Sequence, residues 1–125
     1  MDENEISYII RKGIFNVYNG LGPGLLESVY QKVLLYELED LGLKVAQEVS
    51  VPIIYNQKLF DFNYKIDLLV EDKVIVELKS VKNLEDVHYK QLYTYLRLAD
   101  KKLGILVNFN SNDIIENIKR VVNKL

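Results

Sequence analysis

Two neighbouring segments of this chain are apolar on both faces, and they constrain its fold more than any other feature. Residues 66–70 read Ile-Asp-Leu-Leu-Val, and residues 74–79 read Val-Ile-Val-Glu-Leu-Lys. Runs of this kind form strands in a sheet that is covered on both sides. The chain therefore needs helices on each face of a sheet. Its 125 residues, 49% of them hydrophobic, are enough for one such domain.

The rest of the chain supplies these helices and the other strands. Apolar residues at helical spacing predict helices over residues 6–18, 25–41, 84–99 and 113–125. β-branched and apolar runs predict strands over residues 45–55, 64–70, 74–80 and 103–109. The expected order is α-α-β-β-β-α-β-α. This is an α/β fold in which helices flank a mixed central sheet, as one domain over residues 1–125 with a parallel crossover between the last two strands.

Composition excludes several classes of protein. The chain has no cysteine, which excludes a disulfide framework and a thiol nucleophile, and its single histidine excludes a His-rich zinc site. No apolar run approaches the roughly 20 residues of a membrane helix, and the acidic start does not resemble a signal peptide. We therefore expect a soluble cytoplasmic domain without a membrane partner. The net charge of -2 argues against holding nucleic acid by bulk charge alone, although a bound cation would still allow a nuclease.

Charged residues interrupt both apolar segments. Asp67 lies in the first, and Glu77 and Lys79 lie in the second. Glu77 and Lys79 share one face of their strand because side chains alternate. A two-residue turn between the strands would place Asp67 on the opposite face. A three-residue connection over 71–73, or a bulge, would place Asp67 opposite Glu77. A shared site therefore predicts the odd-length connection or the bulge.

Such a site would suit a hard divalent cation. Mg²⁺ prefers about six oxygen ligands, and Asp67, Glu77 and the backbone carbonyl of Leu78 could provide some of them. A bound ion lowers the pKa of water and neutralises a phosphate oxygen, and Lys79 would face the attacking water or the charge that develops on phosphorus. This chemistry cleaves phosphodiesters. The spacing is loose, however, and a solvated strand face with a surface ion pair also explains it.

The helix expected over residues 84–99 carries polar residues on its packing face. His88, Gln91 and Tyr95 share this face, and Gln91 could orient a carboxylate, a lysine or a metal-bound water. His88 and Tyr95 could instead border the core with their polar tips in water. Glu27 falls in the first turn of an earlier helix, where the helix dipole is a sufficient reason for a carboxylate.

These residues resemble a known family. Gly24-Leu-Leu-Glu27-Ser-Val-Tyr30 is similar to the signature of the GxxExxY proteins, which are placed in the PD-(D/E)XK nuclease superfamily. The segments around Asp67, Glu77-Leu-Lys79 and His88-Tyr-Lys-Gln91 follow in the order that the family has, and the resemblance spans nearly the whole chain.

The resemblance implies a restriction-endonuclease-like core and assigns roles within it. Asp67 and Glu77 would be metal ligands, Glu27 would complete the metal site, and Lys79 would be the catalytic lysine. Gln91 and Tyr95 resemble the Gln-x-x-x-Tyr motif of RecB-like nucleases, where it supports the active site. Tyr30 and His88 belong to the same matching segments and would be further supporting residues.

Two functions follow as expectations. The first is a nuclease that uses Mg²⁺, with Mn²⁺ as an alternative, to hydrolyse phosphodiester bonds in nucleic acid, with DNA preferred and water as the nucleophile. The second is a nucleic-acid-binding or protein-interaction module that kept the fold without efficient turnover. Because a chain this small covers few base pairs, a homodimer or a partner protein would help it hold a duplex. Basic residues that could meet phosphate follow the second apolar strand: Lys79, Lys82, Lys90, Arg97, Lys101 and Lys102.

Overall fold

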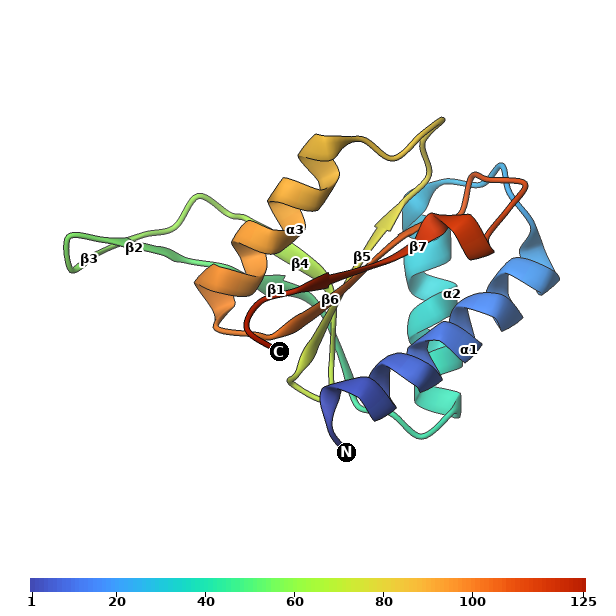
Figure 1. The fold of residues 1–125 in the computed structure, drawn as a ribbon, viewed down its shortest axis with the longest axis horizontal. Helices are drawn as coiled ribbons and strands as arrows, with labels where there is room; N and C mark the ends of the chain where they lie inside the picture. The colour runs from blue at the N-terminus through green and yellow to red at the C-terminus, as the bar shows by residue number, and fades with distance from the viewer.

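The computed structural model describes all of residues 1–125 as three layers, with a sheet between helices (Figure 1). The helices are α1 (Glu3–Leu21), α2 (Glu27–Asp40) and α3 (Asp86–Ala99), with a short 3-10 turn, η1 (Ile115–Asn117). The central sheet contains β1 (Val45–Ser50), β4 (Lys65–Val70), β5 (Val74–Lys79), β6 (Leu103–Asn108) and β7 (Ile118–Val122), in the order β1-β4-β5-β6-β7. A separate two-stranded hairpin consists of β2 (Ile53–Tyr55) and β3 (Lys58–Phe60). This α/β architecture confirms the expected fold class, and no helix has the length and apolar character to cross a membrane.

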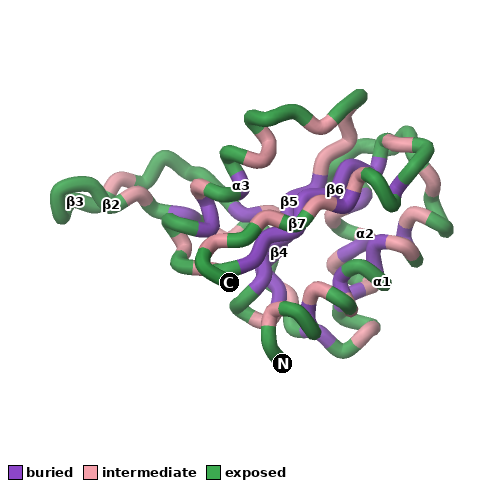
Figure 2. The backbone as a smooth tube through the Cα atoms, viewed as in Figure 1, coloured by how far each residue is buried: buried purple, intermediate pink, exposed green.

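Each face of the sheet packs against its own helices. Alternate residues such as Leu68, Val76 and Ile105 join the larger apolar cluster under α1 and α2. Leu69, Ile75 and Leu106 belong to a smaller cluster under α3. The central strands are accordingly the most buried part of the chain, as the colouring of Figure 2 shows. Burial on both faces confirms what the apolar runs predicted.

The connections around β5 are also as expected. Val70 pairs with Val74, so residues 71–73 form the odd-length connection that places Asp67 beside Glu77. From β5 the chain crosses over through α3 and returns as β6, which runs parallel to β5 with Lys79 opposite Asn108. This crossover places α3 over the face of the sheet opposite to α1 and α2 (Figure 1).

The strand predicted over residues 45–55 is two strands that belong to different sheets. β1 ends before Pro52, which has no N–H to donate to a ladder. β2 then pairs with β3, which sequence patterning missed, across a tight turn in which Asn56 and Gln57 have φ of 50° and 65°. This hairpin projects away from the three layers (Figure 1).

The helix predicted over residues 113–125 is wrong. After η1, residues 118–122 form β7, which pairs antiparallel with β6 and closes its free edge. The apolar residues of this segment fit a helical period. In the strand they pack on both faces of the sheet, because Ile118 packs under α1 and α2 whereas Val121 packs under α3. Pairing the backbone of the buried strand β6 outweighs the local helical pattern.

Candidate functional site

The ladder between β4 and β5 stops where the acidic residues begin. Its last pair is Leu68 with Val76. Beyond it, the Asp67 N–H donates to Glu77 Oε1 at 3.4 Å, and the Leu78 N–H donates to Asp67 Oδ2 at 2.9 Å. The two side chains thus occupy the place where backbone pairing would continue. They form what we call the carboxylate pair, Asp67 and Glu77.

The carboxylate pair lies in a setting that opposes negative charge. Glu77 is only 5% exposed, and this burial, followed by the negative charge of Asp67, raises the pKa of Glu77 to about 9. Burial also raises the pKa of Asp67, against the opposing effects of the Leu78 N–H and of Lys79. At neutral pH the pair therefore retains a proton. A cation could replace it.

Lys79 lies at the end of β5, half-buried, on the same side as Glu77. Its positive charge lowers the pKa of both carboxyl groups, so it is electrostatically part of the site. It makes no ion pair, because the one ion pair in the chain joins Lys101 and Asp72 at 3.2 Å. The alternative of a solvated surface ion pair does not describe the carboxylate pair, since Glu77 is buried.

Tyr95 closes the site from the α3 side. It is 7% exposed and packs in the cluster that contains Leu69 and Ile75. Burial, followed by the charge of Glu77, raises the pKa of Tyr95. The Gln91 Nε2 donates to the Tyr95 hydroxyl at 3.2 Å. A hydrogen bond therefore joins Gln91 and Tyr95 on the α3 side of the carboxylate pair.

His88 serves the helix rather than the carboxylate pair. Its Nδ1 accepts the Glu85 N–H at 2.9 Å, and the Glu85 side chain in turn bonds to the backbone of His88. This reciprocal arrangement caps the start of α3. The structure thus gives His88 a structural role at the start of α3.

Tyr30 holds the loop before α2. Its hydroxyl donates to the Gly22 carbonyl at 2.5 Å and accepts the Leu25 N–H at 3.1 Å, while its ring stacks on Phe109 at 4.5 Å. The Ser80 hydroxyl donates to the Leu25 carbonyl at 2.6 Å. The loop is therefore fixed against the end of β5, just beyond Lys79.

Glu27 lies exposed in the first turn of α2, and the structure does not bring it into the carboxylate pair. No three acidic or histidine side chains converge closely enough to hold a metal ion by themselves. Gln31, one turn after Glu27 on the same helix face, donates to the Asp67 carbonyl at 3.3 Å. The start of α2 is therefore directed toward Asp67.

Two residues near Asp67 were not found by sequence reasoning. Gln31 also donates to Glu48 Oε1 at 2.9 Å, and the negative charge of Glu48 raises the pKa of Asp67. Glu48 has a left-handed backbone, with φ of 52°, at the one position where the ladder between β1 and β4 is interrupted. Spacing from Glu27 could have indicated Gln31. Nothing in the sequence marks the unusual backbone of Glu48.

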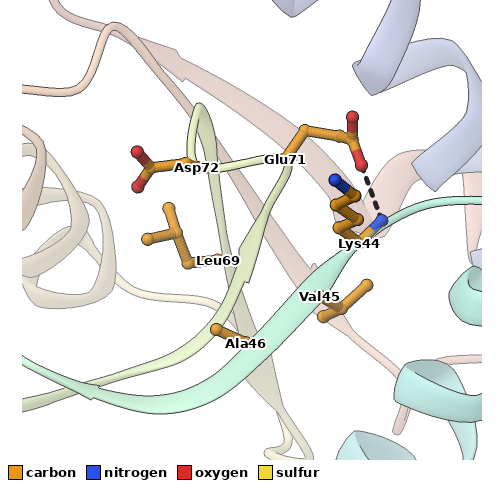
Figure 3. Close-up of a pocket in the computed structure, with 6 residues that line it drawn as sticks. All are labelled: Lys44, Val45, Ala46, Leu69, Glu71 and Asp72. Carbon is orange, nitrogen blue, oxygen red and sulfur yellow. Dashed lines mark hydrogen bonds between the residues drawn. The ribbon is translucent and has the colours of Figure 1, made fainter.

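A hollow that is separate from the carboxylate pair lies beside the turn between β4 and β5 (Figure 3). It measures about 460 Å³. Its acidic residues already have partners: Glu71 Oε2 accepts the Lys44 N–H at 2.6 Å, and Asp72 pairs with Lys101. These contacts fix the turn, and the candidate site remains the carboxylate pair.

Comparison with known families agrees with this geometry. Residues 4–121 match the family model described as the PD-(D/E)XK nuclease superfamily. Searches of curated proteins and of solved structures find no match. The matched residues include nearly the whole sheet. They also include the point where the pairing of β4 with β5 stops and Asp67 and Glu77 meet, with Lys79 beside them. The structure has a mixed sheet between helices, with two acids and a lysine where two central strands stop pairing. The family model matches almost the full length of this chain. The chain therefore belongs to the PD-(D/E)XK nuclease superfamily.

Proposed function

We propose that this protein is a divalent-metal-dependent nuclease that hydrolyses phosphodiester bonds in DNA, and that it belongs to the GxxExxY group of its superfamily. The observation that carries the proposal is the carboxylate pair. Two desolvated acids meet where the pairing of β4 with β5 stops, and neither forms an ion pair with a basic side chain. The fold alone would not require this arrangement. Two apolar residues would continue the sheet at lower cost.

The residues present fit a hard divalent cation. Asp67 and Glu77 offer carboxylate oxygens, and the Leu78 carbonyl lies between Glu77 and Lys79 in the chain. Burial, followed by repulsion from Asp67, raises the pKa of Glu77, and a bound cation would offset both effects. We infer that Mg²⁺ is held here, with Mn²⁺ as a substitute. When bound, the ion supplies positive charge for the phosphate and lowers the pKa of water.

The remaining roles follow from position. Lys79 places an ammonium group beside the carboxylate pair, where it would stabilise the charge that develops on the phosphate. Gln91 fixes the Tyr95 hydroxyl at the wall of the site. Glu27 extends from the start of α2 without a bonding partner, and we propose that it completes the ligand set once a cation is bound. Tyr30 supports this by holding the loop before α2.

The test is cleavage of labelled single-stranded and duplex DNA with Mg²⁺, with Mn²⁺ and with EDTA. We expect cleavage only with a divalent ion. Asp67→Asn, Glu77→Gln and Lys79→Met should each lower the rate by at least about a hundredfold, as loss of a charge-stabilising group does. Glu39→Gln, an exposed acid at the far end of α2, is the matched control and should cleave at the wild-type rate.

Two results would contradict the proposal. One is cleavage that persists in EDTA or in the Asp67→Asn variant, since it would place the chemistry elsewhere or reveal a contaminant. The other is the absence of cleavage of any DNA form by folded wild-type protein with either ion. That result would favour a module that binds nucleic acid or protein without turnover.

A further inference from the structure

Four aromatic rings lead from the projecting hairpin to the carboxylate pair. Phe60 and Phe62 stack with centroids 5.9 Å apart and planes 1° from parallel. Phe62 and Tyr64 are 6.4 Å apart, and Tyr64 and Tyr95 are 6.3 Å apart. We call Phe60, Phe62, Tyr64 and Tyr95 the aromatic row. The row ends at Tyr95, which packs in one cluster with Ile75. Ile75 lies two residues before Glu77 on the same face of β5, so the row ends beside the site.

The middle of the aromatic row is open to solvent. Phe62 is 59% exposed and Tyr64 is 46% exposed. Tyr55, on the same face of the hairpin as Phe60, is 67% exposed. Burial in the core therefore does not explain these rings. A continuous exposed aromatic surface of this kind is typical of a binding site.

A groove runs beside the aromatic row along α3. It measures about 390 Å³, and its walls include Ile53, Tyr64, Lys90, Gln91 and Tyr95. The hairpin thus contributes one wall through Ile53, and the candidate site contributes the other through Gln91 and Tyr95. The groove connects the exposed rings with the residues that border the carboxylate pair.

We call the aromatic row together with its groove the strip. The charge along the strip is opposite in sign to that of the whole chain. Lys58 lies on the hairpin and Lys90 lines the groove, and Lys58 Nζ is 5.3 Å from the Phe60 ring centroid. Asp61, between Phe60 and Phe62, accepts the Asn63 N–H at 2.9 Å and so shapes the loop. The chain as a whole carries -2. The strip therefore complements a polyanion.

We propose that the aromatic row and its groove bind single-stranded nucleic acid, with bases stacked on the exposed rings and phosphates near Lys58 and Lys90. Aromatic rings and cations arranged along one path are how proteins hold single strands without reading sequence. A duplex does not fit this surface, because its base faces are already stacked on one another. The role of the strip in feeding a strand to the carboxylate pair rests on the proposed function, but binding by the strip does not.

Binding is tested in EDTA, so that cleavage plays no part. The probe is a fluorescein-labelled oligodeoxythymidine of about 15 nucleotides, followed by anisotropy. Phe62→Ala should weaken binding about tenfold, the loss expected for one base–aromatic stack. Tyr36→Ala removes a ring on α2 that lies outside the row and is 69% exposed, and this variant should bind as wild type. An abasic oligonucleotide of the same length, which keeps the phosphates, should bind at least about tenfold more weakly than the thymidine probe.

A second variant reports on stacking directly. The chain has no tryptophan, so Phe62→Trp introduces one indole into the row. This variant should retain wild-type affinity, and its emission should be quenched as the oligonucleotide saturates the protein. An oligouridine titration shows whether the sugar matters, and binding of either probe with quenching supports the proposal.

Three results would overturn the inference: equal affinity of Phe62→Ala and wild type, equal affinity for abasic and thymidine probes, or tighter binding to duplex than to single strand. A halved particle mass in Phe62→Ala would instead assign the strip to contacts between copies of this chain. The Asp67→Asn variant separates the two proposals, since it should bind the probe normally. If wild type bound the oligonucleotide but cleaved no DNA, the proposed function would be wrong and this inference would still hold.

Discussion

Glu77 is a glutamate that the protein buries beside another acid. Its side chain is 5% exposed and it accepts a hydrogen bond from the Asp67 backbone. Water cannot solvate its charge there, and the proton is retained to about pH 9. The metal-free protein therefore stores an electrostatic cost at this residue that rises with pH, and a cation would relieve it.

This cost predicts an unusual pH dependence of stability. The pKa of Glu77 is raised from 4.5 to about 9 in the folded state. The protonated carboxyl group therefore contributes its full stabilisation to the free energy of unfolding below pH 4.5, and this stabilisation is lost as pH rises toward 9. In EDTA, the free energy of unfolding of wild type should fall relative to that of Glu77→Gln between pH 5 and 9, by about 1 kcal/mol or more. Urea unfolding at several pH values measures it.

The control for this experiment is Glu39→Gln, which changes an exposed carboxyl of α2. Its stability should follow that of wild type at every pH. Parallel stability curves for wild type and Glu77→Gln would mean that Glu77 ionises normally, and the account of the carboxylate pair would then be wrong.

At the scale of elements, the position of α3 depends on a close approach to β6. A Cβ built on Gly104 would lie 2.7 Å from Leu92 Cδ1 and 2.9 Å from its Cγ. Leu92 is fully buried, and the same helix carries Gln91 and Tyr95 to the wall of the site. The absence of a side chain at Gly104 thus sets how closely the functional face of α3 can approach the sheet.

Gly104→Ala should therefore destabilise the fold by about 1–3 kcal/mol through overpacking. Combining it with Leu92→Ala should cost less than the sum of the two single changes, because each makes room for the other. Chemical denaturation of the four proteins gives the coupling energy. Gly20→Ala is the matched control, since nothing lies within 4 Å of its added Cβ. Strictly additive costs would show that this contact does not fix α3.

At the scale of the whole molecule, α2, β4 and β5 meet around the site and in the core beneath it. Gln31 bonds to the Asp67 carbonyl from α2, and Ser80, just after β5, bonds to the Leu25 carbonyl before α2. An ion held by the carboxylate pair would join β4 to β5, and with Glu27 as a further ligand it would join α2 to both strands. Binding of such an ion should therefore stabilise the entire domain.

Thermal unfolding with and without Mn²⁺ tests this expectation. At an ion concentration about 100 times the Kd, the gain should be about 3 kcal/mol, seen as a rise of several degrees in Tm. The Asp67→Asn/Glu77→Gln double variant should show no such rise. If both proteins gained equally, the ion would be binding to other acids among the 18 in the chain, and the carboxylate pair would not be the metal site.

The local sequence pattern was sufficient to predict much of the fold and the two acids of the site. The apolar runs around Asp67 and Glu77 predicted two buried strands, and the parity of side chains along them predicted the odd-length connection that the pairing of Val70 with Val74 confirms. These properties depend on neighbours in sequence, whose alternation and turn length are fixed by covalent geometry. The amino-acid sequence by itself therefore identifies both residues of the carboxylate pair.

The tertiary structure decided what local pattern leaves open. Residues 118–122 form a strand because β6 has a free edge there, and Glu48 and Gln31 lie beside Asp67 because β1 and α2 pack around it. The row of rings from Phe60 to Tyr95 exists only once Tyr64, in the segment after the hairpin, packs against α3. Such juxtapositions depend on which distant backbone groups and surfaces remain to be satisfied, and a chain read one segment at a time does not contain that information.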